Sequence, residues 1–288
     1  MSKRWIWGGI AVLLGVLAVG FFVVDRATSG IAGFLVWRAL SPDAQSGRSA
    51  RINEVDIYFE TYGEGEPLLL AHGGLATIES MHEQITRFSG ERRVIVPERR
   101  EHGRSSAVEG PLTYADMADD MIALLDFLEI QRTDIFGWSD GGIVALDMAM
   151  RFPERVGKIA IFGSNYHFDG VEDTLGDSLG DPASEEIAPM RVMYEAVSPN
   201  PDRWPEFFEK VTTMWRTEPQ YTESELATID APTLVMVGEF DVVRPEHTES
   251  LASAIPDSQL KVLPGATHFA PLDDADRVND LLSSFLAK

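Results

Sequence analysis

Short apolar runs alternate with longer amphipathic stretches along most of the chain. From residue 51 onward, the apolar runs are rich in Val, Ile and Leu, and the stretches between them repeat apolar residues with the spacing of a helix. This alternation predicts an α/β fold with a mainly parallel sheet covered by helices. The expected strands are Pro67–Ala71, Arg93–Pro97, Thr133–Phe136, Val156–Phe162, Pro232–Val237 and Gln259–Leu263.

Local signals mark where several elements begin. Arg51–Thr61 alternates polar and apolar residues, which predicts an antiparallel hairpin at the start of the sheet. Thr113 and Asp116 have the spacing of a capping box, so we expect a helix to begin there. A second helix is expected over Ile143–Met150, and the closing helix follows Pro271.

The N-terminal pattern is different. Trp5–Val24 carries no charge and, as a helix at about 1.5 Å per residue, would span about 30 Å, the thickness of a bilayer core. Lys3 and Arg4 precede it, which predicts a transmembrane anchor with the rest of the chain on the outer, periplasmic or extracellular side. Two alternatives stay open: a buried helix, and a signal peptide whose removal would give a secreted protein beginning near Phe21 or Gly30.

Three parts of the chain follow from these patterns: an anchor or signal segment over residues 1–29, a connector over 30–50, and the α/β domain over 51–288. Charge is unevenly divided among them. The net charge is −22, yet residues 1–40 contain four basic residues and one acidic residue, so residues 41–288 carry −25. Such an acidic surface repels phosphate backbones, which excludes nucleic acid as a partner.

Composition removes several kinds of site. With no cysteine, the chain has no disulfide, no thiolate metal site and no cysteine nucleophile. No group of histidines and carboxylates has metal-site spacing, so neither a metal nor another cofactor is expected. The chemistry must therefore come from other side chains, and the sequence leaves the oligomeric state open.

A glycine-rich turn at residues 137–141 is the first candidate for chemistry. Its sequence, Gly-Trp-Ser-Asp-Gly, lies between an expected strand and an expected helix, where a G-x-S-x-G turn exposes its serine at the carboxyl edge of a sheet. Gly137 and Gly141 are needed because side chains there would clash where strand and helix approach each other. The turn therefore predicts Ser139 as a nucleophile.

Two further residues complete a candidate triad. A serine hydroxyl needs a neighbouring base, itself oriented by a carboxylate, and in this architecture the chain order is serine, acid, histidine. His268 follows the last expected strand and is the candidate base; Asp241 follows the strand before it and is the candidate acid, with Glu239 as the alternative. The remaining histidines have the wrong order or context: His72, His82, His102, His167 and His247.

Two backbone N–H groups are expected to form an oxyanion hole. They belong to Asp140, directly after the nucleophile, and to Gly74, in the turn after the first expected parallel strand. The Asp140 carboxylate would repel an oxyanion, so we expect a cation beside it: Arg99, Arg100 or the ammonium group of an aminoacyl substrate. Trp138 either packs beneath the turn or joins Asp140 in binding substrate.

These motifs resemble the α/β-hydrolase family over about residues 51–288. The form GWSDGG is similar to that of small esterases and peptidases of the biphenyl-hydrolase-like and proline-iminopeptidase-like kinds. One departure is in loop 98–105, where Glu98 and Glu101 replace the Asp and the first Gly of the usual D-x-R-G-x-G-x-S. The matching segments are His72–Gly74, Arg100–Ser105, Gly137–Gly141, Asp241 and Gly265–His268.

The resemblance implies a cap over the site, formed by residues 166–230. Helical patterns around Ile187–Ala196 and Trp204–Trp215 fit such a cap, and the segment is rich in aromatic residues. Most of these aromatic residues must bury the cap on the sheet, and a minority should line an apolar acyl or alcohol pocket.

The sequence as a whole predicts a membrane-anchored serine hydrolase acting on a small-molecule carboxylic ester or amide. Ser139 attacks the carbonyl carbon, His268 transfers the proton and Asp241 fixes the imidazole tautomer. Two alternatives are a cofactor-free perhydrolase with the same triad and a non-catalytic binding module on the same fold. Epoxide hydrolases and haloalkane dehalogenases of this fold use an aspartate nucleophile, which the position of serine in the turn disfavours.

Overall fold

The computed structural model describes residues 30–41, 47–172 and 180–287. The chain divides into two compact units, Met1–Pro42 and Asp43–Lys288. The first contains helix α2 (Ile31–Leu40). The expected anchor at residues 5–24 lies outside the described residues, and within the described ranges no helix is long and apolar enough to cross a membrane.

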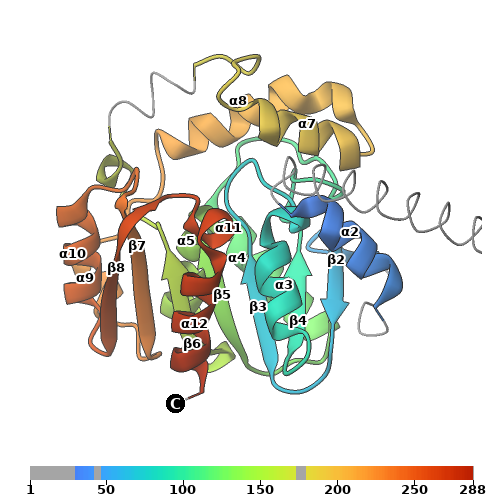
Figure 1. Cartoon of the computed structure of the whole chain (residues 1–288). Coiled ribbons are helices and arrows are strands. Elements are labelled where there is room, and N and C mark those ends of the chain that lie inside the picture. Colours follow the sequence, from blue (N-terminus) through green and yellow to red (C-terminus); the bar gives the residue numbers. More distant parts are fainter. Residues whose placement is uncertain (1–29, 42–46, 173–179, 288) are drawn as a thin grey trace, which may run out of the picture. The chain divides into compact units, whose positions relative to one another are not determined.

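An eight-stranded sheet is the frame of the second unit (Figure 1). Its strands are β1 (Arg48–Ile52), β2 (Val55–Tyr62), β3 (Pro67–Ala71), β4 (Arg93–Pro97), β5 (Thr133–Trp138), β6 (Val156–Phe162), β7 (Thr233–Phe240) and β8 (Ser258–Thr267). Their order is β1-β2-β4-β3-β5-β6-β7-β8. The hairpin β1–β2 is antiparallel and joins β4 in antiparallel fashion, whereas β4, β3 and β5 to β8 are parallel. The mainly parallel α/β sheet is confirmed.

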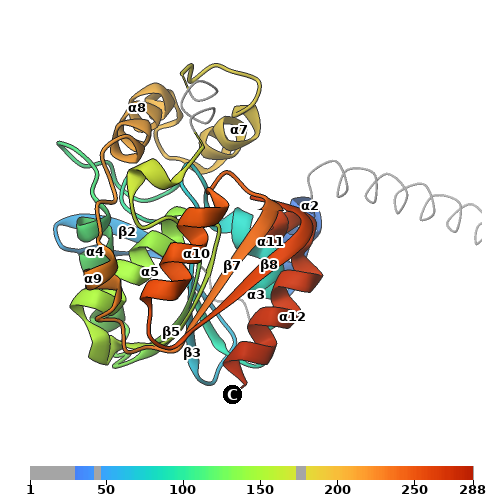
Figure 2. The ribbon, with the colours of Figure 1, turned by 90° about the vertical axis from the view of Figure 1, so that its left-hand side faces the viewer.

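Helices cover both faces of this sheet (Figure 2). One face carries α3 (His82–Phe88), α11 (Ala270–Asp273) and α12 (Ala275–Leu286). The other carries α4 (Tyr114–Phe127), α5 (Asp140–Arg151), α9 (Glu223–Leu226) and α10 (Pro245–Ala254). Because both faces are covered, the central strands are apolar throughout, and Leu68, Leu69 and Leu70 of β3 are fully buried.

The local signals explain several boundaries. The Thr113 hydroxyl accepts a hydrogen bond from the Asp116 N–H at 3.0 Å and begins α4, as predicted. Helix α5 ends at Arg151, two residues before Pro153, because proline cannot continue a helix. Its first turn begins at Asp140, earlier than the predicted Ile143, since the glycines of the turn are already helical.

Two helices form a cap over the carboxyl ends of the parallel strands (Figure 1). They are α7 (Ala188–Val197) and α8 (Trp204–Trp215), close to the predicted helical segments. Tyr194 stacks on Phe207 with ring centroids 4.9 Å apart, and both residues are buried. Trp204 and Phe208 are buried beside them. These aromatic residues therefore form the packed interior of the cap.

Two strand boundaries differ from the prediction and bear on the site. Strand β1 begins at Arg48, inside the expected connector, so the sheet starts three residues early. Strand β8 continues to Thr267, past Pro264 and Gly265, which locally indicate a turn. Its pairing with β7 shifts register between Gly238 and Phe240. A bulge of this kind lets the pair continue, so β8 ends directly before the candidate histidine.

Candidate active site

The turn after β5 holds Ser139 in a strained backbone conformation. Ser139 has φ +55° and ψ −122°, at the junction of β5 and α5. A Cβ added at Gly137 would lie 2.4 Å from the Gly141 carbonyl oxygen, and one added at Gly141 would lie 2.0 Å from the Ala71 carbonyl oxygen. Only glycine fits at either position, as predicted. The turn leaves Ser139 partly exposed at the carboxyl edge of the sheet.

The structure brings the candidate base and acid together. The His268 Nδ1 lies 2.8 Å from the Asp241 Oδ1, and the Asp241 side chain is only 1% exposed. Asp241 also accepts from the Val243 N–H at 3.1 Å. When the carboxylate is ionised it can only accept, so Nδ1 carries the proton and Nε2 remains a base. Glu239, the alternative acid, accepts instead from the Gly265 N–H at 2.7 Å.

The serine and the histidine are linked through their neighbours. Trp138 donates from its indole Nε1 to the His268 backbone carbonyl at 2.9 Å. The Ser139 N–H donates to the Phe162 carbonyl, and a Cβ added at the following Gly163 would lie 2.7 Å from the His268 Nδ1. Between these two described residues, no hydrogen bond joins the Ser139 hydroxyl to the imidazole. In serine hydrolases this hydrogen bond often shortens only when substrate binds.

The two expected oxyanion donors lie in the turn after β3 and at the start of α5. A Cβ added at Gly74 would lie 2.5 Å from the Asp140 Oδ2, so the turn after β3 is packed directly against the start of α5. Neither the Gly74 N–H nor the Asp140 N–H donates a hydrogen bond to any of the described residues. Both N–H groups are thus free to bind an oxyanion next to Ser139.

The Asp140 carboxylate has partners that the sequence analysis missed. Its Oδ1 accepts from the Tyr114 hydroxyl at 3.0 Å, and the Trp215 indole Nε1 lies 2.9 and 3.0 Å from its two oxygens. Arg99 is near enough to act on Asp140 through its charge, although among the described residues the two side chains form no ion pair. Arg100 pairs with Asp120 instead, so the prediction of Arg100 as the partner is wrong. Burial raises the pKa of Asp140, and the Arg99 charge and these hydrogen bonds oppose the rise.

The side chains expected to bind substrate are both buried. Trp138 is 4% exposed and packs edge-to-face against Phe269, with ring centroids 6.0 Å apart. Asp140 is 3% exposed. Neither side chain is therefore open to contact with a substrate. The Trp138 indole supports the backbone at His268, and the Asp140 carboxylate is already hydrogen-bonded by Tyr114 and Trp215.

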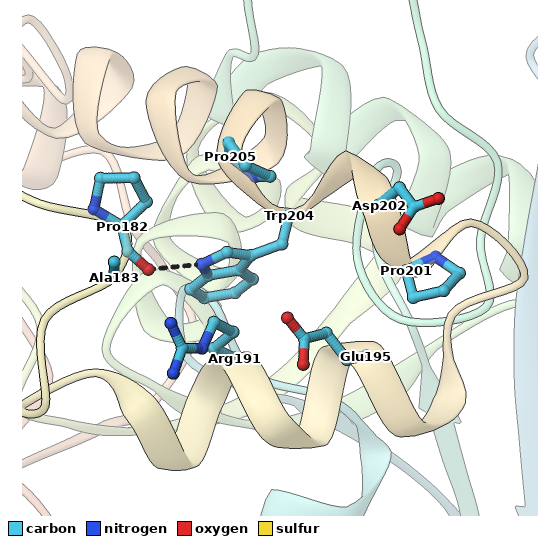
Figure 3. A pocket seen from close by; sticks show the side chains of 8 residues that line it. All are labelled: Pro182, Ala183, Arg191, Glu195, Pro201, Asp202, Trp204 and Pro205. Atoms are coloured by element: carbon cyan, nitrogen blue, oxygen red, sulfur yellow. Dashed lines mark hydrogen bonds between the residues drawn. The ribbon is translucent and has the colours of Figure 1, made fainter.

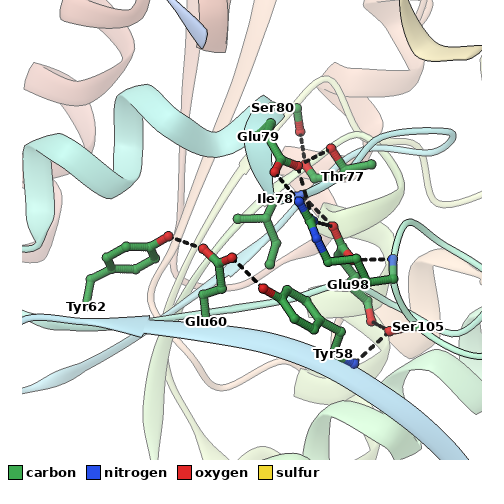
Figure 4. Close-up of polar contacts among 10 residues, drawn as sticks. Tyr58, Glu60, Tyr62, Thr77, Ile78, Glu79, Ser80, Glu98 and Ser105 are labelled. Carbon is green, nitrogen blue, oxygen red and sulfur yellow. Dashed lines mark hydrogen bonds and ion pairs between the residues drawn. The ribbon is translucent and has the colours of Figure 1, made fainter. Parts of the chain in front are cut away.

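Both glutamates that depart from the usual pattern in the loop after β4 pair with basic side chains, and Figure 4 shows the surroundings of Glu98. Glu98 is fully buried and pairs with Arg104, which also pairs with Glu79. Burial raises the pKa of Glu98 to about 7, against the lowering by Arg104. Glu101 takes φ +67°, a conformation that favours the glycine usual at this position, and its carboxylate pairs with Lys210 of α8. The ion pair between Glu101 and Lys210 therefore joins this loop to the cap.

A cavity of about 520 Å³ lies within the cap (Figure 3). Trp204 is the first residue of α8, and its indole, which donates to the Pro182 carbonyl at 2.8 Å, extends towards Arg191 and Glu195 of α7. None of its lining residues belongs to the candidate triad or oxyanion hole. This cavity is therefore separate from the chemistry assigned to Ser139.

Comparisons with known proteins agree with this arrangement. A model of the family described as Alpha/beta hydrolase family matches residues 68–281. The chain is 31% identical to 2-hydroxymuconate semialdehyde hydrolase of Pseudomonas putida over 78% of this chain and 89% of that protein. It is 25% identical to serine hydrolase BPHL of Mus musculus over 84% and 87%. The solved structure of Est816, an N-acyl homoserine lactone degrading enzyme, is 27% identical with a TM-score of 0.70, over 83% of this chain and 100% of that one.

Proposed function

The chain belongs to the α/β-hydrolase family, and on this premise we propose that it is a serine hydrolase that cleaves a carboxylic ester or a small amide. The observation that carries the proposal is the 2.8 Å contact between the His268 Nδ1 and the buried Asp241 carboxylate, next to a serine in a strained strand–helix turn. A base oriented in this way is what a serine nucleophile requires. The lactone-degrading activity of the structural relative is consistent with an ester-type bond.

The proposed reaction has two halves. The Ser139 hydroxyl attacks the carbonyl carbon while its proton passes to the His268 Nε2, and the resulting oxyanion is bound by the Gly74 and Asp140 N–H groups. The intermediate collapses to an acyl-serine, and the leaving alcohol or amine takes the proton from the imidazolium. Water then attacks the acyl carbon and gives a proton to the His268 Nε2. The imidazolium returns this proton to the Ser139 oxygen as the carboxylic acid is released. Asp241 stays ionised throughout and stabilises the imidazolium.

The same triad and oxyanion donors can catalyse other reactions, so a panel of substrates is needed to identify the activity. The Pseudomonas putida relative is named as a hydrolase of a muconate semialdehyde, and a perhydrolase would replace water by peroxide at the acyl-serine. A panel of graded acyl esters, lactones, aminoacyl amides and a vinylogous diketone, each with and without acetate and peroxide, separates these activities. We expect the highest kcat/KM on an ester or amide without peroxide.

The nucleophile is tested directly with a fluorophosphonate probe. Wild type should be labelled, Ser139→Ala should not, and kcat should fall about 10⁶-fold by comparison with other serine hydrolases. Ser284→Ala, at an exposed position on α12, is the matched control and should behave as wild type. An unlabelled wild type, or equal labelling of Ser139→Ala, would show that the chain is a binding module or uses another nucleophile.

We also propose that residues 5–24 anchor the enzyme in a membrane with the hydrolase domain on the outer side. The support is the charge-free length of this segment and the basic pair before it. Because residues 41–288 carry −25, electrostatic docking to anionic lipid is excluded, so the protein should remain in the membrane fraction at high salt. Deletion of residues 1–29 should release it. Recovery of a soluble mature form beginning near Phe21 or Gly30 would instead identify a signal peptide.

A further inference from the structure

Arg99, in the loop after β4, is a buried charge that binds backbone carbonyls. It is 1% exposed, and its guanidinium donates from one nitrogen to the His72 carbonyl and from the other to the Gly73 carbonyl at 2.9 Å. Among the described residues, no carboxylate lies within ion-pair distance of it. A charge buried without such a partner is costly, so its position calls for an explanation beyond packing.

The two carbonyls that Arg99 binds determine where the next two N–H groups point. A peptide bond is planar and trans, so the N–H of each residue points away from the carbonyl of the residue before it. Holding the Gly73 carbonyl therefore fixes the direction of the Gly74 N–H. The turn itself lies against the nucleophile, since a Cβ added at Gly73 would lie 3.5 Å from the Ser139 Cβ.

The turn needs an external support because its sequence provides little rigidity. Gly73 and Gly74 are consecutive glycines, which lose the most conformational freedom on ordering. The His72 ring donates from Nδ1 to the Gly73 carbonyl at 2.8 Å, but this bond joins neighbours in the chain and does not tie the turn to the sheet. Arg99 comes from the end of β4, the neighbour of β3, and a guanidinium fork has a fixed geometry.

We propose that Arg99 is a positioning residue of the oxyanion hole: its guanidinium fixes the Gly73–Gly74 peptide so that the Gly74 N–H already points at the developing oxyanion. The proposal rests on the proposed function. Donors that are fixed in place before the reaction need no reorganisation when charge develops, which is the main advantage of an oxyanion hole. Arg99 touches neither the substrate nor the reacting atoms and acts through the backbone of Gly74.

The charge of Arg99 adds a second contribution at the same place. The Asp140 carboxylate is buried beside Gly74, and the Arg99 charge lowers its pKa and so favours its ionised form. The positive charge also offsets the repulsion between this carboxylate and an oxyanion. A neutral residue at position 99 would lose both the support of the peptide and this compensation.

The test compares Arg99→Met with Arg100→Met. Arg100 is the next residue of the same loop, and its guanidinium pairs with Asp120 at 2.7 and 2.8 Å, away from the turn after β3. Both variants lose a largely buried guanidinium, so both should be less stable in urea. Only Arg99→Met should lower kcat on the best ester of the panel, by about tenfold to a hundredfold, with KM within about threefold of wild type.

A boronic acid provides the readout that a structural role would not move. It forms a tetrahedral adduct with the serine and places an oxygen in the oxyanion hole. Its inhibition constant should rise in Arg99→Met by the same factor as kcat falls, and should stay at the wild-type value in Arg100→Met. Arg99→Lys keeps the charge but not the fork, so it should be folded and have a kcat between those of Arg99→Met and wild type.

Two results would overturn the inference. One is a folded Arg99→Met or Arg99→Lys with the kcat and boronic acid inhibition of wild type. The other is an equal loss of kcat in Arg100→Met, which would assign the effect to the loop as a whole. Failure of the proposed function looks different, since wild type would then not react with the fluorophosphonate at all.

Discussion

Replacing Trp215 by phenylalanine removes the indole N–H that connects cap helix α8 to the Asp140 carboxylate. The indole Nε1 lies 2.9 and 3.0 Å from the two oxygens, and Asp140 is 3% exposed, so no solvent replaces the lost donor. A hydrogen bond to a charged group typically contributes about 1.5–3 kcal/mol. We therefore expect Trp215→Phe to lower the free energy of unfolding by about 2 kcal/mol at neutral pH.

The cost should also depend on pH, with a sign set by the Asp140 carboxyl. Burial raises its pKa in the folded protein, and the hydrogen bond from Trp215 is one of the interactions that oppose the rise. The folded state then holds a proton that the unfolded state loses above about pH 3.9, so stability falls as pH rises towards the folded pKa. Without the Trp215 donor, the pKa of Asp140 in the folded protein rises further, so the free energy of unfolding keeps decreasing to a higher pH. The variant is therefore destabilised more at high pH than at low pH.

Urea unfolding of wild type and Trp215→Phe at pH 5 and pH 8 measures the effect. We expect a larger difference at pH 8. Trp204→Phe is the matched control, because the Trp204 indole donates to the neutral Pro182 carbonyl at 2.8 Å and its loss should cost the same at both pH values. An equal cost of Trp215→Phe at the two pH values, or an undiminished cost in an Asp140→Asn background, would refute this reasoning.

Three further substitutions test other parts of the site. Asp241→Asn should lower kcat about 10⁴-fold on a chromogenic ester with little change in KM, because the histidine loses its tautomer partner; an unchanged kcat would point to another acid. Gly74→Ala places a Cβ 2.4 Å from the Trp215 ring and should lower kcat at least about tenfold, whereas Gly90→Ala, whose Cβ meets nothing within 4 Å, should not. Burial raises the pKa of Glu98 to about 7, so the free energy of unfolding should decrease as pH rises from about 4.3 to 7. Urea unfolding of Glu98→Gln over the same range should not show this decrease.

The central strands could be predicted because each is a short apolar run that ends at a turn residue. Strands β3, β4 and β6 have the expected bounds, since their side chains are buried on both faces. The end of β8 could not be predicted in this way. Pro264 and Gly265 locally indicate a turn, but pairing with β7 across a bulge keeps them in the sheet.

In the candidate site, too, features set by local sequence could be predicted, whereas contacts between distant parts of the chain could not. Asp241 and His268 each follow a strand end, so their meeting at one edge of a parallel sheet could be inferred from chain order. The partners of Asp140 could not be inferred. Tyr114 lies 26 residues before it on α4, and Trp215 lies 75 residues after it on the cap. Such contacts depend on how helices pack, and no local pattern records that packing.

The Asp140 carboxylate connects cap helix α8 to the proposed oxyanion hole through the Trp215 indole. A full negative charge about 4 Å from an oxyanion would cost about 4 kcal/mol at an effective dielectric near 20. The hydrogen bonds from Tyr114 and Trp215 and the charge of Arg99 weaken the negative electrostatic potential of Asp140 at the Gly74 N–H. The same interactions lower the pKa of Asp140 and so favour the ionised form, which is the source of that potential. Weakening any one of them therefore changes both the potential at the oxyanion and the protonation of Asp140, in opposing directions. The effects of substitutions at these positions should accordingly be non-additive, because they act on one shared charge.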